Sequence, residues 1–145
     1  MFTPAPRDQG RPVARIPWVS IAHSKHRVRV SGQTVPYAVI GEGEPVVLIH
    51  GLGGSSRCWA WSAPALASRY RVYLLDLPGF GVLRRLHRHF ALSTASTWLA
   101  EWMRAAGVGR AHLVGHSMGA FIAAHLAVER QRWGEVIRQA NIRLE

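Results

Sequence analysis

The sequence contains a single cysteine, Cys58, so no disulfide can form within the chain. No apolar run approaches the ~18–20 residues that cross a bilayer. The opening stretch, MFTPAPRDQGRPVARIPWVS, lacks the continuous apolar segment of a secretory signal peptide. A chain of 145 residues has room for one ordinary domain. We therefore expect one cytoplasmic domain without a membrane span.

Acidic residues are also few, since 8 Asp and Glu stand against 18 Lys and Arg, for a formal charge of +10. The basic residues are nearly all arginine, with Lys25 the only lysine, and only the stretch LRRLHRH at 83–89 holds a dense group of them. Proteins that bind nucleic acid usually gather such charge on one face or tail. We therefore expect no nucleic-acid partner, and the apolar fraction of 48% is too high for a disordered chain.

The order of apolar runs and turn residues predicts alternating strands and helices. Apolar and charged residues alternate over residues 27–40, which favours a hairpin. Continuous aliphatic runs predict buried strands at 46–50, 70–76 and 111–115. Helical spacing predicts a first helix over 56–68, capped by Ser55 or Ser56 and shortened by Pro64. It predicts a second helix over 93–106, which starts with serine and threonine caps and ends at Gly107. A third helix is predicted over 118–130.

Strands that alternate with helices form parallel sheets joined by right-handed crossovers. We therefore expect an α/β fold with a mostly parallel sheet and flanking helices over residues 27–130. A loose lead-in over residues 1–26 and a polar tail over residues 131–145 complete the expected organisation.

One serine stands between two glycines where the last expected strand meets the last helix, in the stretch Gly115-His116-Ser117-Met118-Gly119. A chain that turns from strand to helix within a few residues lifts the serine hydroxyl above the sheet edge, and larger side chains at the glycine positions would collide with the neighbouring elements. The new helix also aims free N–H groups and its positive end at that space. This pattern is typical of a nucleophile elbow.

A second glycine-rich turn, His50-Gly51-Leu52-Gly53-Gly54, follows the first expected parallel strand. Because parallel strands end at the same sheet edge, its backbone N–H groups should face the same space as Ser117. Acyl transfer needs such donors for the oxyanion that forms when a carbonyl is attacked. We expect the N–H groups of Leu52 and Met118 to be the donors, with that of Gly53 as the alternative to Leu52.

Other residues that could carry chemistry have simpler interpretations. His87 and His89 form a weak metal pattern without nearby carboxylates, and His112 is expected in a strand, so it makes no helical metal pair with His116. The tryptophans are expected to pack in the core. We predict no metal and no cofactor.

Three stretches taken together resemble the α/β-hydrolase family: VVLIHGLGGSSRCW, YLLDLPGFG and AHLVGHSMGAFIAAHLA. The resemblance implies an acyl-transfer hydrolase that acts on small-molecule esters, thioesters or related substrates. It implies Ser117 as nucleophile, with Leu52 and Met118 at the oxyanion hole, and Asp76 as a residue that shapes its loop. An aspartate nucleophile is disfavoured, because the elbow holds serine.

The family places an acid and then a histidine after the nucleophile, whereas this chain offers only His125, Glu129, Glu135 and Glu145 there. His125 should lie about two helical turns from Ser117, and His116 should point away from it. His87 and His89 are weaker candidates for the base. The chain is therefore expected to resemble the N-terminal half of a hydrolase. The alternative is an inactive fragment or interaction module that self-associates or binds a complementing C-terminal half.

Overall fold

A mixed five-stranded sheet forms the centre of the molecule, in the strand order β1-β2-β4-β3-β5. The structure, a computed structural model, describes residues 24–86 and 91–139, and the side chains of residues 25–86 and 91–131. Residues 24–26 belong to the first strand, and the rest of the expected lead-in lies outside the described residues. The α/β fold predicted from the sequence is confirmed.

The first two strands form the predicted hairpin. Strands β1 (Ser24–Val30) and β2 (Gln33–Ile40) pair antiparallel around a turn at Ser31 and Gly32, where both residues have positive φ angles of 47° and 78°. Strand β2 also pairs antiparallel with β4. The hairpin therefore closes one side of the sheet.

The other strands run parallel, as predicted. Strand β3 (Glu44–Ile49) lies between β4 (Tyr70–Leu75) and β5 (His112–Gly115), with Leu48 opposite both Leu74 and Val114. Val46 to Ile49 and Val72 to Leu75 are buried, because both faces of these two strands are covered. The aliphatic runs that predicted buried strands are thus explained for β3 and β4.

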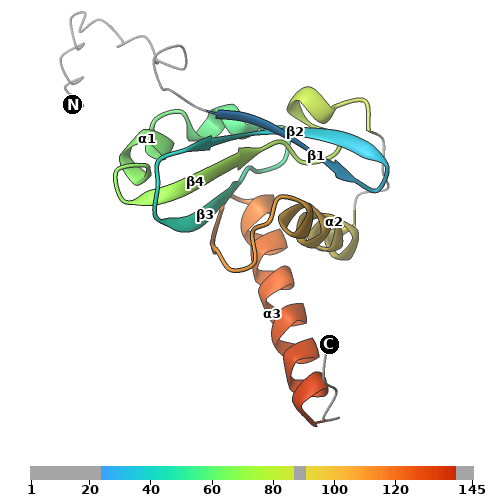
Figure 1. The fold of residues 1–145 in the computed structure, drawn as a ribbon. Coiled ribbons are helices and arrows are strands. Elements are labelled where there is room, and N and C mark those ends of the chain that lie inside the picture. Colours follow the sequence, from blue (N-terminus) through green and yellow to red (C-terminus); the bar gives the residue numbers. More distant parts are fainter. Residues whose placement is uncertain (1–23, 87–90, 140–145) are drawn as a thin grey trace, which may run out of the picture.

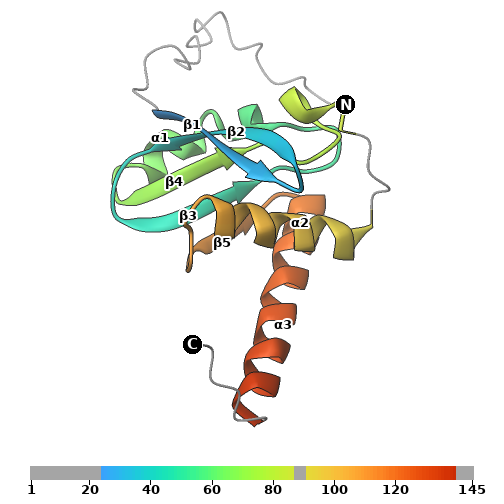
Figure 2. The same ribbon diagram turned by 45° about the vertical axis from the view of Figure 1, so that its right-hand side comes forward.

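Helices cover the two faces of the sheet unequally (Figures 1 and 2). The short helix α1 (Ser62–Leu66) packs on one face over Val46, Leu48, Val72 and Leu74. Helices α2 (Leu92–Ala105) and α3 (Met118–Gln139) pack on the other face, over a larger core that includes the buried Trp98 and Trp102. Helix α3 then leads away from the sheet (Figure 1) and continues through residues 131–139.

Two of the helix predictions need correction in detail. The helix expected over 56–68 is divided into a 3-10 helix, Ser56–Trp59, and α1, with Ser55 capping the former and Pro64 in the first turn of α1. Proline is tolerated in a first turn because the N–H it lacks would have no helical partner there. The serine and threonine caps expected for α2 are also wrong, since Ala91 occupies the N-cap and makes no side-chain hydrogen bond.

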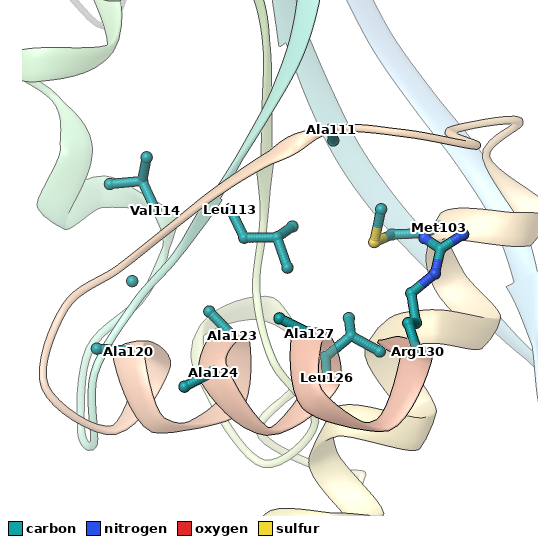
Figure 3. Close-up of a pocket in the computed structure, with 11 residues that line it drawn as sticks. Met103, Ala111, Leu113, Val114, Ala120, Ala123, Ala124, Leu126, Ala127 and Arg130 are labelled. Carbon is teal, nitrogen blue, oxygen red and sulfur yellow. The ribbon is translucent and has the colours of Figure 1, made fainter. Parts of the chain in front are cut away.

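Strand β5 was expected to be buried, and that expectation is wrong. In the described part of the chain β5 pairs only with β3, and His112 and Val114 are exposed. Between β5 and α3 runs an open groove of about 710 Å³ (Figure 3). Its walls are mostly apolar: Leu113 and Val114 on the strand, Ala120, Ala123, Ala124 and Ala127 on the helix, with Met103 and Arg130 at one end.

None of the helices in the described residues combines the length and apolar character that crossing a bilayer requires.

Trp59 packs beside the smaller core, under α1, whereas Trp61 is 58% exposed. The expected packing role therefore holds for Trp59, Trp98 and Trp102 but not for Trp61.

Candidate active site

The chain turns sharply from β5 into α3 at Ser117. This residue is exposed and has a φ of 53°, in the left-handed region that residues other than glycine rarely adopt. The turn is fixed on either side, because the N–H of His116 donates to the carbonyl of Ile49 at 3.0 Å and the N–H of Gly119 donates to the carbonyl of His116 at 2.9 Å. The hydroxyl-bearing residue therefore projects from a turn that is tied to the end of β3.

The two glycines of the motif have the steric role that the sequence predicted. A Cβ atom on Gly115 would collide with the backbone of Gly119 and Ala120 at the start of α3. A Cβ atom on Gly119 would collide with the carbonyl of Ile49 and lie 2.7 Å from that of His50. Both glycines thus allow the helix to approach the strand ends closely.

The glycine-rich turn after β3 lies directly beside this serine. A Cβ atom on Gly51 would stand 3.1 Å from the Cβ of Ser117 and 3.0 Å from the carbonyl oxygen of His116. Leu52 is 74% exposed, and Gly53 has a φ of 68°. Within the described residues, the N–H groups of Leu52 and Met118 donate to no protein acceptor. The two predicted motifs therefore meet, and both expected donors are free to bind a ligand.

His50 was expected to shape the turn, and it braces the turn through contacts that the sequence did not reveal. The imidazole is fully buried, and its Nε2 accepts a hydrogen bond from the N–H of Leu77 at 2.9 Å. Nε2 is therefore unprotonated, so Nδ1 carries the proton and donates to the carbonyl of Gly51 at 2.8 Å. A polar residue that directly follows a buried aliphatic run is a signal for such a role, because buried polar groups need partners.

Asp76 holds the two neighbouring loops. Its Oδ1 accepts from the N–H of Ser56 at 2.6 Å and its Oδ2 from the N–H of Val82 at 2.8 Å. A Cβ on Gly81 would collide with this carboxylate, so the loop passes very close to it. The carboxylate is buried and both its oxygens are engaged by backbone donors, in keeping with the loop-shaping role expected of it.

Cys58 is the other candidate nucleophile near these loops. Burial raises the pKa of its thiol, a backbone hydrogen bond opposes the rise, and the nearby charge of Asp76 adds to it. The reactive form of cysteine is the thiolate, and a raised pKa keeps the thiol protonated near neutral pH. Ser117 is therefore the stronger candidate.

His125 does not reach Ser117. It lies on α3 eight positions later in the chain, and its Nδ1 is 2.9 Å from the Oγ of Ser96 on α2. Because the Ser96 hydroxyl donates to the carbonyl of Ser93, it accepts from His125, and the pair links the two helices. The sequence missed this contact, since nothing in the local pattern pairs residues of different helices.

The site as described has an exposed hydroxyl and free donors but no base in contact with the hydroxyl. In the described ranges, no imidazole or carboxylate hydrogen-bonds Ser117. His87 and His89 lie outside those ranges. Within the same ranges no three His, Cys, Asp or Glu side chains gather as a metal would require.

Comparison with known proteins identifies the family. The sequence matches the alpha/beta hydrolase fold family over residues 44–132. It is 42% identical over 101 residues to the dihydrolipoyllysine-residue acetyltransferase component of the acetoin cleaving system of Cupriavidus necator, covering 69% of this chain and 27% of that protein. It is also 42% identical over 88 residues to a pimeloyl-(acyl-carrier protein) methyl ester esterase of Aeromonas hydrophila, covering 61% of this chain and 34% of the esterase.

Among solved structures, a membrane phospholipase A described as a bacterial virulence factor superimposes with a TM-score of 0.70 at 35% identity. The match covers 76% of this chain and 36% of the phospholipase. The chain thus spans about a third of the length of the proteins it resembles. The matched residues include the turn after β3 and the turn at Ser117, and the protein belongs to the alpha/beta hydrolase fold family.

Proposed function

We propose that this protein hydrolyses carboxylic esters or related acyl compounds, with Ser117 as the nucleophile. The observation that carries the proposal is the position of Ser117, exposed at a φ of 53° and in contact distance of the Gly51 turn. A residue other than glycine that is held in the left-handed backbone region often marks a functional site. One of the relatives is named as a methyl ester esterase, which agrees with this chemistry.

In the proposed reaction, the Oγ of Ser117 attacks the carbonyl carbon of the ester and its proton passes to a general base. The carbonyl oxygen becomes negatively charged, and the free N–H groups of Leu52 and Met118 donate hydrogen bonds to it. The alcohol leaves with a proton from the protonated base, and water then releases the acid from the acyl-serine. His50, Gly51, Gly53, Gly115, His116 and Gly119 shape the two turns that hold these groups.

The base is proposed to come from outside the described residues. His125 is engaged by Ser96, and His50 has both ring nitrogens occupied. His87 and His89, which lie outside the described residues, stay candidates within the chain. A preformed oxyanion hole alone leaves some acceleration over the uncatalysed reaction, so weak activity in the absence of a base agrees with the proposal.

The competing proposal is binding without turnover. It is favoured by the lack of a described base at Ser117 and by the exposed apolar groove beside β5. In that case the turn at Ser117 would be an inherited shape with no covalent chemistry.

Covalent labelling separates the two proposals. The full chain is treated with a fluorophosphonate, and the second-order rate of labelling is measured by mass spectrometry and compared with that of a free serine amide. We expect labelling at Ser117 to be faster by about 10²-fold or more, since a single oxyanion donor contributes that much. Ser117→Ala should abolish it.

Ser68→Ala is the matched control, because Ser68 is also exposed but lies just after α1, where its hydroxyl donates to the carbonyl of Ala65. This variant should label like the original chain. Labelling of Ser117 that is no faster than that of the free serine amide would reject the hydrolase proposal for this chain and favour binding without turnover.

A further inference from the structure

The loops that follow β3 and β4 carry three exposed arginines: Arg57, Arg84 and Arg85. The only acidic residue in the described parts of these loops is Asp76, which is buried and bonded to two backbone N–H groups. None of the three guanidinium groups forms an ion pair with it. This edge of the sheet therefore presents positive charge that no acidic side chain in the described ranges neutralises.

The guanidinium donors are largely unused. In the described part of the chain, those of Arg57 and Arg85 form no hydrogen bond, and Arg84 makes only a 3.5 Å contact with the carbonyl of Gly81. The opposite edge of the sheet, where β3 and β4 begin, has mixed charge, because Glu42 and Glu44 lie there with basic residues. Among the described residues, the loops at the edge that holds Ser117 thus carry three exposed arginines and no exposed acidic side chain.

A continuous set of contacts joins these arginines to the serine. Asp76 binds the N–H of Ser56, next to Arg57, and that of Val82, two residues before Arg84. His50 ties the same β4 loop to Gly51, which abuts Ser117. The backbones of the two basic loops are therefore linked, through Asp76 and His50, to the turn that abuts Ser117.

Large apolar side chains are exposed on the same edge. Leu52 is 74% exposed and Phe121, in the first turn of α3, is 68% exposed. Exposed apolar surface can mark a binding site for a ligand. An apolar surface next to free guanidinium groups suits a ligand that has an apolar chain and a negative charge.

We propose that the site takes esters whose apolar chain bears an anionic group, a carboxylate or a phosphate. Arg57, Arg84 and Arg85 bind the anion, and Leu52 and Phe121 contact the chain. Guanidinium groups suit this task, because their planar donors match carboxylate and phosphate oxygens. The proposal rests on the proposed ester hydrolysis at Ser117 for the identity of the ligand as an ester.

The test measures binding rather than turnover. The full chain with Ser117→Ala is titrated with monomethyl suberate and with methyl octanoate, which has the same chain length and the same ester but no charge. Dissociation constants are measured by ligand-detected NMR. We expect the charged ester to bind about tenfold more tightly at low salt, and the difference to shrink as salt screens the charges. A third titration uses the analogue of monomethyl suberate that carries a phosphonate in place of the carboxylate. Its dissociation constant shows whether the site prefers a phosphate-like group or a carboxylate.

Arginine variants locate the effect. Arg57→Gln, Arg84→Gln and Arg85→Gln should each weaken binding of monomethyl suberate by about two- to fivefold, the range of exposed ion pairs. Binding of methyl octanoate should not change. Arg69→Gln is the matched control, because Arg69 is exposed just before β4, at the opposite edge, and should leave both constants unchanged.

Equal affinity for the two esters, no detectable binding of either, or an equal effect of Arg69→Gln would overturn the proposal. Binding to phosphatidylglycerol vesicles without discrimination between the free esters would also overturn it, and would assign the arginines to a membrane surface. Because the test uses a chain without the Ser117 hydroxyl, it can succeed while covalent labelling fails. Failure of this proposal and failure of the proposed hydrolysis are thus separate results.

Discussion

Leu48 and Val114 are neighbours across the β3–β5 ladder, yet Leu48 is fully buried and Val114 is 37% exposed. We call the β3–β4 pair the covered seam, because α1 lies over one face and α2 and α3 lie over the other. We call β5 with the adjacent groove side of α3 the open rim. The two regions have similar apolar sequences, so the difference in burial comes from the elements around them. We expect the covered seam to contribute most of the free energy of unfolding. Substitutions on the open rim should change that free energy little.

The largest expected effect is in the covered seam. Leu48→Ala should lower the free energy of unfolding by about 2–5 kcal/mol, because it removes a fully buried side chain and leaves a cavity between packed elements. Denaturant unfolding followed by circular dichroism measures the change. A loss below about 1 kcal/mol would show that the seam repacks freely and would break the comparison.

The next effect lies where the two regions meet. Gly119→Ala should destabilise the fold by about 1–3 kcal/mol, because its Cβ collides with the carbonyl of Ile49. Gly109→Ala is the control, since a Cβ there has no neighbour within 4 Å. Thermal unfolding of both variants gives the comparison. Equal midpoints would mean that the start of α3 is not held tightly against β3.

A much smaller effect is expected on the open rim. Val114→Thr should change the free energy of unfolding by no more than about 0.5 kcal/mol, because its side chain is partly in water and its face of β5 is uncovered. The same denaturant experiment as for Leu48→Ala provides the measurement. A loss as large as that of Leu48→Ala would indicate that another chain covers β5 in solution.

The smallest effect concerns Tyr37 on β2, which packs against the larger core under α2 and α3. Burial raises the pKa of its phenol, Tyr73 adds to the rise, and Arg71 opposes it. The stabilising contribution is fully present below the pKa of an unfolded tyrosine and is lost as the pH rises through the pKa of the folded one. Urea unfolding at alkaline pH should therefore show a shallower loss of stability for Tyr37→Phe than for the original chain. If stability falls equally with pH in the two proteins, the ionisation of Tyr37 does not contribute to the pH dependence.

The sequence predicted much of the covered seam and the turn at Ser117, because their signals are local. Continuous aliphatic runs identified β3 and β4, and the flanking glycines identified the turn at Ser117, whose steric reason is the close approach of Gly119 to Ile49. Each of these sequence signals lies within one short stretch, although the contact of Gly119 with Ile49 joins distant parts of the chain. The roles of Ser117, Leu52 and Met118 in catalysis stay predictions.

What the sequence did not predict depends on distant partners. Val114 belongs to an apolar run like those of β3 and β4, and only the strand order of the described sheet places it at an edge. The tautomer of His50 follows from the N–H of Leu77, 27 positions away. The contact of Ser96 with His125 joins two helices. Such pairings require the three-dimensional fold, because no local pattern encodes them.

The backbone at Ser117 has a thermodynamic consequence of its own. A side chain held at a φ of 53° costs roughly 1–3 kcal/mol, whereas glycine adopts this conformation freely. Ser117→Gly should therefore fold more stably than the natural chain while losing the hydroxyl. The protein would be more stable without this exposed hydroxyl, so under the proposed hydrolysis the serine at this position exchanges stability for reactivity.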